Sequence, residues 1–105
     1  MIAVVDYGRG NLYSLSQALS YIGVDHVVTN KPDDIDAAQA IVLPGVGAFG
    51  DAMDALDARD LIPPLRNAVA RGVPLLGICL GMQILAATSE EFGDRDGLAV
   101  IPGSV

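Results

Sequence analysis

Residues 75–85, LLGICLGMQIL, decide the fold that this sequence predicts. The stretch begins with an apolar run typical of a buried strand and ends with apolar residues at helical spacing. Between them lies Cys79, the only cysteine, with Gly77 and Gly81 two positions away on either side. A strand, a sharp turn and a helix around one cysteine predict a nucleophile held above the carboxyl end of a sheet strand. The alternative is a small buried core residue, which is what a lone cysteine usually is.

The rest of the chain continues this alternation of short apolar runs and amphipathic segments. Strands are predicted within residues 1–8, 24–29, 40–45, 73–78 and 98–103. Helices are predicted over residues 12–22, from residue 31, over 49–70 with a break at two prolines, and after Cys79, where Met82 and Leu85 should face inward. Residues 88–97 are expected to form a polar loop. This order predicts an α/β fold with a doubly wound, mostly parallel sheet flanked by helices.

The last predicted strand, residues 98–103, is not followed by a helix that would cover it. Because parallel sheets are normally covered on both faces, we expect a truncated fold. Residues 1–105 would then be the amino-terminal part of a single larger domain.

Composition and charge exclude several classes of protein. The chain of 105 residues is 51% hydrophobic and 18% charged, which favours a folded core over disorder. Its net charge of -7 disfavours binding to nucleic acid or to anionic lipid. No apolar run approaches the roughly 18 residues of a membrane span, and no signal-peptide pattern opens the chain. With a single cysteine, a reducing, cytoplasmic setting is expected.

The stretch LPGVGAFGDAM, residues 43–53, places a glycine loop after the third predicted strand. This loop and Cys79 should meet at the same edge of the sheet, where open α/β sheets bind their ligands. Gly45 and Gly47 permit a peptide to flip, so the backbone N–H of Val46 could join that of Leu80 in binding the oxyanion of a tetrahedral intermediate. The alternative is an ordinary strand-to-helix turn.

The first predicted strand also ends in a glycine loop, DYGRGNL at residues 6–12. Its spacing does not match a nucleotide-binding motif, so Asp6 and Asn11 are expected to close the turn and cap the next helix, or to shape a partner surface. The acidic residues elsewhere match no metal-binding spacing. We therefore predict no metal and no cofactor.

Activation of Cys79 requires a helix N-terminus and a base. The N-terminus of the predicted helix would stabilise negative charge on the sulfur of Cys79. The only histidine, His26, begins the second predicted strand at the opposite edge of the sheet, roughly 15 Å away or more. His26 is therefore not expected to be the base.

Three segments together resemble the class I glutamine amidotransferases, and among them the glutaminase subunits of imidazole glycerol phosphate synthase. They are GICLGMQ around Cys79, PGVGAFGDAM at residues 44–53 and DYGRGNL at residues 6–12. The resemblance implies a Cys, His, Glu triad that hydrolyses glutamine to glutamate and ammonia, with Cys79 forming a glutamyl thioester. It implies oxyanion donors at Val46 and Leu80, and glutamine contacts at Gly45, Gly47, Gln83 and Glu91.

The resemblance also implies a heterodimer with a (β/α)8 barrel cyclase, which uses the ammonia in histidine biosynthesis. The family's catalytic histidine and glutamate lie beyond the position that matches Val105. Residues 1–105 alone are therefore expected to turn glutamine over poorly. Two alternatives remain at this point: another cysteine-elbow hydrolase of the same superfamily, and a non-catalytic α/β interaction module with a structural Cys79.

Overall fold

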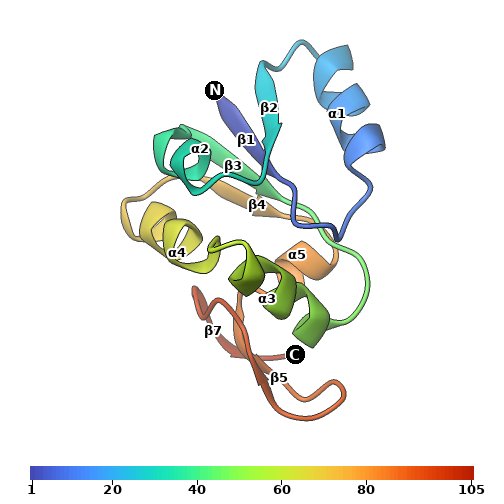
Figure 1. The fold of residues 1–105 in the computed structure, drawn as a ribbon, viewed down its shortest axis with the longest axis vertical. Coiled ribbons are helices and arrows are strands. Elements are labelled where there is room, and N and C mark those ends of the chain that lie inside the picture. The colour runs from blue at the N-terminus through green and yellow to red at the C-terminus, as the bar shows by residue number, and fades with distance from the viewer.

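The computed structural model describes all 105 residues and contains two separate sheets (Figure 1). The larger sheet has four strands, β1 (Ile2–Val5), β2 (His26–Thr29), β3 (Ala40–Leu43) and β4 (Leu75–Gly77). All its pairs are parallel, and the order across the sheet is β2-β1-β3-β4. These strands fall within four of the predicted apolar runs, as expected for a sheet buried on at least one face.

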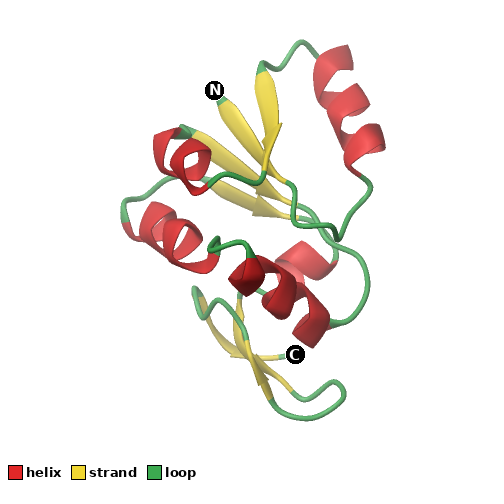
Figure 2. Cartoon of the chain, viewed as in Figure 1, coloured by secondary structure: helices red, strands yellow, loops and turns green.

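Five helices accompany the strands: α1 (Leu12–Tyr21), α2 (Pro32–Ala37), α3 (Phe49–Ala58), α4 (Ile62–Ala70) and α5 (Leu80–Gln83). The strand order reverses direction after β2, so right-handed crossovers place α1 on one face and α2 and α4 on the other. Figures 1 and 2 show this separation. The doubly wound prediction is therefore confirmed. None of the helices has the length and apolar character that crossing a membrane requires.

The break between α3 and α4 follows from local backbone chemistry. Asp60 adopts φ 57° after the end of α3, and a new helix begins at Ile62. Pro63 and Pro64 stand in the first turn of α4, where the amide that proline lacks would have no helical partner. The predicted break at the two prolines is confirmed.

The main core lies between the larger sheet and the helices α2, α3 and α4. Alternate strand residues point toward these helices, among them Ala3, Val5, Ile41 and Leu43, all at most 1% exposed. Each buried aliphatic side chain of this size contributes about 1.5–3 kcal/mol through removal from water. This face therefore anchors the strand ends that carry the site.

The opposite face of the sheet is only partly covered by α1. No residue of α1 is fully buried, and Ile22, which caps its C-terminal end, is 68% exposed. Ile2, Leu19, Val42 and Leu76 help to line an apolar groove of about 290 Å³ beside this helix. This face of the sheet is therefore left partly open to solvent.

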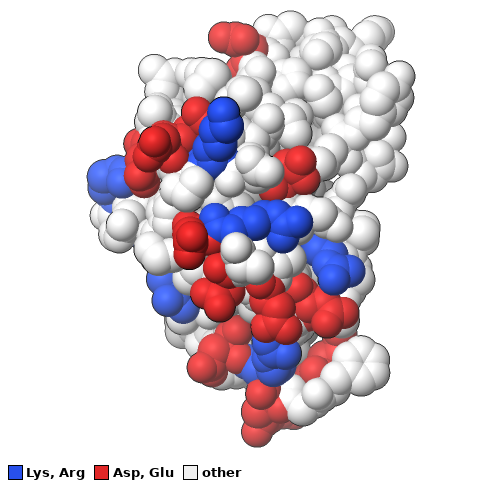
Figure 3. All heavy atoms as spheres, in the orientation of Figure 1, with Lys and Arg blue, Asp and Glu red and all other residues white.

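Charged side chains are unevenly spread over the molecule. Figure 3 shows them gathered over α2, α3 and the second sheet, whereas the span of α1 contains none. The charged surface and the apolar groove are therefore separate regions.

The second sheet contains β5 (Ala86–Ser89), β6 (Arg95–Asp96) and β7 (Ile101–Ser104), in the order β6-β5-β7. β5 is antiparallel to β6 and parallel to β7. Two predictions are corrected here. The stretch expected to be a polar loop, residues 88–97, contains parts of a hairpin, and the last strand joins this second sheet instead of the larger one.

The second sheet is separate from the larger one because the residues before β7 are held by buried contacts with α4 and the main core. Ile84 and Leu98 are almost fully buried in the main core. Arg66 of α4 donates from Nε to the Leu98 carbonyl at 2.9 Å and from Nη2 to the Gly97 carbonyl at 3.2 Å. These contacts fix residues 97–98 under α4, so the strand that follows cannot continue the larger sheet.

Candidate active site

Cys79 occupies a strained turn between β4 and α5. Its backbone has φ 54° and ψ -119°, a conformation that side chains other than glycine rarely adopt. Strain of this kind costs about 1–3 kcal/mol and persists where the surrounding structure imposes it. The thiol is exposed. The predicted strand, turn and helix are confirmed, and the alternative of a buried core cysteine is wrong.

The two glycines beside Cys79 let α5 lie directly on the strands. A Cβ added to Gly81 would overlap the carbonyl oxygen of Leu43 and lie 2.7 Å from its carbonyl carbon. A Cβ on Gly77 would lie 2.8 Å from the Cα of Met82. Both clashes involve backbone, so no side-chain rotation can relieve them. The pattern Gly-x-Cys-x-Gly is therefore a packing requirement of the turn.

The helix after Cys79 is shorter than predicted. α5 has 4 residues, one turn, and its Met82 is 58% exposed, so the inward orientation predicted for Met82 is wrong. The burial predicted for Leu85 is confirmed, and Ile84 is fully buried. The helix ends early because these two side chains enter the core and the chain turns at once into β5. Met82 is thereby left on the solvent side.

The oxyanion loop, defined here as residues 44–47, contacts the elbow through its backbone. The carbonyl of Gly45 accepts a hydrogen bond from the Leu80 N–H at 3.2 Å, while the N–H of Val46 donates none. In a trans peptide the carbonyl and the following N–H point in opposite directions. The Val46 N–H therefore points away from the Leu80 amide. In this conformation the two predicted donors do not converge, and Leu80 is already engaged.

A single peptide rotation would change this arrangement. Turning the Gly45–Val46 peptide would release the Leu80 amide and bring the Val46 N–H to the same side. Gly47, which follows, has φ 104° with no atom near its missing Cβ, so the chain can absorb such a turn. The same rotation would therefore make both predicted donors, the Val46 and Leu80 amides, available together.

Tyr7 makes a hydrogen bond to Pro44, the first residue of the oxyanion loop, and the sequence analysis did not predict this contact. Its hydroxyl donates to the Pro44 carbonyl at 2.6 Å, and the residue is 1% exposed. Burial raises the pKa of Tyr7 to about 12, with Arg9 acting weakly in the opposite direction. The signal in the sequence was its position: Tyr7 follows β1, which pairs directly with β3.

The hairpin of the second sheet brings Glu91 to the start of α3. Glu91 Oε1 accepts a hydrogen bond from the Phe49 N–H at 3.3 Å, two residues after Gly47. A pocket of about 280 Å³ lies here, lined by Ala48, Gly50, Asp51, Glu91, Phe92 and Arg95. Glu91 therefore lies at the start of α3, two residues beyond the oxyanion loop. Gln83 ends α5, half buried and with no hydrogen bond from its side chain within the chain.

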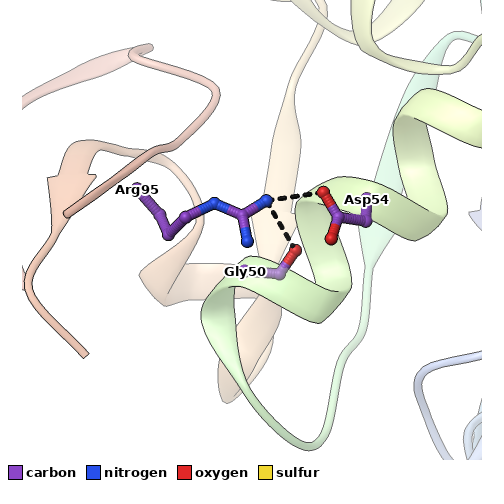
Figure 4. Close-up of polar contacts among 3 residues, drawn as sticks. All are labelled: Gly50, Asp54 and Arg95. Atoms are coloured by element: carbon purple, nitrogen blue, oxygen red, sulfur yellow. Dashed lines mark hydrogen bonds and ion pairs between the residues drawn. The ribbon is translucent and has the colours of Figure 1, made fainter. Parts of the chain in front are cut away.

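Arg95 fastens this hairpin to α3 (Figure 4). Its Nη2 lies 2.5 Å from Asp54 Oδ1 and donates to the Gly50 carbonyl at 3.3 Å. The sequence analysis did not find this pair, because the two residues lie on elements predicted as a helix and a loop. Through it, the segment with Glu91 is tied to the helix that follows the oxyanion loop.

Both ring nitrogens of His26 make hydrogen bonds with residues other than Cys79. Its Nε2 lies 2.8 Å from Ser16 Oγ and its Nδ1 lies 2.9 Å from the Val24 carbonyl. Strands β1 and β3 separate β2 from β4, and His26 stands at the amino end of β2. The prediction that His26 is not the base for Cys79 is confirmed.

The loop after β1 has the local role that its sequence indicated. Asn11 Oδ1 accepts a hydrogen bond from the Ser14 N–H at 3.2 Å and caps α1. Asp6 Oδ1 accepts one from the Gly8 N–H at 3.3 Å and closes the turn. Both side chains are used in shaping the loop.

Comparisons with known proteins agree with this geometry. Residues 3–99 match the family described as "Glutamine amidotransferase class-I". The chain is 50% identical over 105 residues to the imidazole glycerol phosphate synthase subunit HisH of Bacillus cereus (strain B4264), covering 100% of this chain and 50% of that protein. It is 52% identical over 104 residues to the HisH subunit of Moorella thermoacetica, covering 99% of this chain and 50% of that protein.

A solved structure titled "Crystal structure of glutamine amidotransferase" has the same fold. It superposes with a TM-score of 0.78 at 19% identity, covering 99% of this chain and 55% of that one. The chain spans about half the length of the curated relatives that it matches. The family match, which extends over most of the chain and includes the cysteine elbow, shows that this protein belongs to the class I glutamine amidotransferase family.

Proposed function

We propose that residues 1–105 form the amino-terminal part of one glutamine amidotransferase domain, and that the whole protein is the glutaminase subunit of imidazole glycerol phosphate synthase. The observation that carries this proposal is identity of about half the residues with HisH subunits across the whole chain. The exposed, strained Cys79 supplies the nucleophile that such an activity needs.

The proposed reaction begins when Cys79 Sγ attacks the side-chain carboxamide carbon of glutamine. The tetrahedral intermediate collapses with cleavage of the carbon–nitrogen bond, and protonated nitrogen leaves as ammonia. The product is a glutamyl thioester on Cys79. Water then attacks the thioester carbonyl, releasing glutamate and restoring the thiol. Since His26 is bonded elsewhere, the groups that move these protons are expected outside residues 1–105.

The oxyanion loop and the elbow would stabilise the intermediate. We expect the Val46 and Leu80 amides to donate to the developing oxyanion after the Gly45–Val46 peptide has turned. The free backbone N–H of Val46 and the glycine at position 47, which tolerates the turn, support this step. In the orientation observed, the Leu80 amide is occupied, so glutamine hydrolysis would wait for the loop.

Glutamine recognition would use the neighbouring polar groups. The carboxylate of Glu91 suits the α-ammonium group of glutamine, and the uncommitted Gln83 side chain offers both a donor and an acceptor. The peptide groups of Gly45 and Gly47 complete the set. The position of Glu91 beside the oxyanion loop supports this assignment.

We further propose a cytoplasmic heterodimer with a (β/α)8 barrel cyclase that consumes the ammonia in a lyase reaction of histidine biosynthesis. The word "subunit" in the names of the relatives supports an assembly. The cyclase, the heterodimer and the cytoplasmic location extend the proposal to the whole protein.

The test uses the polypeptide encoded by the complete gene, produced with and without the cyclase subunit of the same organism. Glutamate release from glutamine is measured, together with formation of the cyclase product from glutamine alone. We expect both with the complex, and neither when Cys79 is replaced in Cys79→Ser. Glutamate release that survives Cys79→Ser, or its complete absence from the complex, would contradict the proposal.

A further inference from the structure

The DYGRGNL loop contains one buried group that its local roles do not use. Asp6 and Asn11 close the turn and cap α1, whereas the phenol of Tyr7 leaves the loop and reaches Pro44, 37 residues further along the chain. Its hydrogen bond of 2.6 Å is buried. The contact therefore links the end of β1 to the oxyanion loop.

Tyr7 is the only hydrogen-bond donor to the Pro44 carbonyl. A Cβ added to Gly45 would overlap the Tyr7 hydroxyl and lie 2.9 Å from the Gly81 nitrogen, so phenol, loop and α5 fill this space completely. The loop is therefore held at Pro44 from one side. Beyond Pro44, one hydrogen bond holds the loop, from the Leu80 N–H to the Gly45 carbonyl at 3.2 Å, because the amides of Val46 and Gly47 donate none.

A loop whose Pro44 carbonyl is fixed, and whose next peptide is held by a single hydrogen bond, can turn at that peptide. The proline ring limits φ at Pro44, and Tyr7 fixes the orientation of its carbonyl. Rotation is then confined to the Gly45–Val46 peptide, which is the unit that must turn to free the Leu80 amide. A loop without this restraint could reach many orientations, few of which aim two amides at one oxygen.

We propose that Tyr7 is a positioning residue for the oxyanion loop: its hydrogen bond to the Pro44 carbonyl holds the fixed end, so that the turning peptide delivers the Val46 and Leu80 amides to the same oxygen. This proposal rests on the proposed glutaminase function. It assigns a role in transition-state stabilisation to a residue that does not touch the substrate. The raised pKa of Tyr7 keeps its phenol protonated, and therefore a hydrogen-bond donor, throughout the neutral pH range.

The test is Tyr7→Phe in the complete polypeptide, bound to the cyclase subunit. Phenylalanine fills the same space and removes only the hydroxyl. Cys79 is labelled in parallel with diazo-oxonorleucine, a diazoketone that mimics glutamine, and with iodoacetamide, which needs no oxyanion site. We expect about tenfold slower labelling by the diazoketone and an unchanged iodoacetamide rate, because only the first reaction uses the positioned amides. For glutamine, kcat should fall about tenfold while KM changes by less than about twofold.

Tyr13→Phe is the matched control, since Tyr13 is 76% exposed and makes no side-chain hydrogen bond. It should leave every rate unchanged. Equal losses of both labelling rates in Tyr7→Phe, checked against its circular dichroism melting curve, would show a general packing role and overturn the proposal. Unchanged rates would overturn it as well. If the unaltered protein shows no preference for the diazoketone, the glutaminase proposal itself fails, and the two failures are thus distinguished.

Discussion

Replacing Gly81 by alanine should shift α5 off the larger sheet. The added Cβ would overlap the Leu43 carbonyl oxygen and lie 2.7 Å from the carbonyl carbon. The carbon contact alone requires about 0.8 Å of backbone movement to reach an ordinary separation of about 3.5 Å, and the overlap with the oxygen requires more. β3 cannot yield easily, because it pairs with β1 and β4. The helix must therefore move, together with the Cys79 turn.

The cost can be worked from the contacts that this movement strains. Leu43 O also accepts the Ile78 N–H at 3.0 Å, and Gly45 O accepts the Leu80 N–H at 3.2 Å. Weakening these two bonds costs about 1 kcal/mol each, and overpacking adds about 1–3 kcal/mol. The better helix propensity of alanine offsets about 1 kcal/mol. We expect a net loss of about 2–4 kcal/mol in the free energy of unfolding.

The assay is urea unfolding followed by circular dichroism, on the complete polypeptide and its variants. With a slope of about 2 kcal/mol per molar urea, the midpoint should fall by about 1–2 M. Gly23→Ala serves as the control. Gly23 has φ 77° and no atom within 4 Å of its missing Cβ, so only backbone strain of about 1 kcal/mol is expected. A loss for Gly81→Ala no larger than that for Gly23→Ala would refute the packing argument.

Three further predictions concern the same region. Because the neutral phenol of Tyr7 is favoured in the folded state, stability should fall as pH rises past 10 and through 12, with the whole loss of about 2.7 kcal/mol reached only above pH 12. This loss should be absent in Tyr7→Phe, and equal losses in urea unfolding of both proteins would contradict the prediction. Cys79→Gly should abolish labelling by the diazoketone and by iodoacetamide, yet raise the free energy of unfolding by about 1 kcal/mol, since glycine accepts φ 54° without strain. A melting temperature lower than that of the unaltered protein would count against this. Arg95→Met should change stability by less than about 1 kcal/mol, because its ion pair with Asp54 is exposed. It should nevertheless speed amide hydrogen exchange over residues 88–96, and Asp54→Asn should do the same. Unchanged exchange in both variants would show that the ion pair does not hold the hairpin in place.

Much of the candidate site followed from local patterns in the sequence. The elbow at Cys79 was predictable because strand, glycine, cysteine, glycine and helix are all contiguous, and each constrains only its neighbours. The exclusion of His26 was equally local, since a residue that begins a parallel strand must stand at the far edge from one that follows a strand. The capping role of Asn11 needed only the next three residues.

The predictions that failed depended on where distant segments pack. Met82 was expected to face inward because its spacing fits a longer helix, but the burial of Ile84 ends the helix after one turn. The last strand was expected in the larger sheet because a single sheet was predicted, yet Arg66 and the buried Leu98 fix the preceding residues elsewhere. Local propensity carries no information about such competition.

By itself, then, the sequence determined the order of strands and helices as far as α5, the cysteine elbow and the two glycine loops, because hydrophobic period and turn chemistry act over a few residues. Only the tertiary structure decided the orientation of the Gly45–Val46 peptide, the bond from Tyr7 to Pro44 across 37 residues and the pair of Arg95 with Asp54 across 41. These contacts arise when separate elements close on one another. Their geometry depends on how the whole core packs, which no single stretch of sequence specifies.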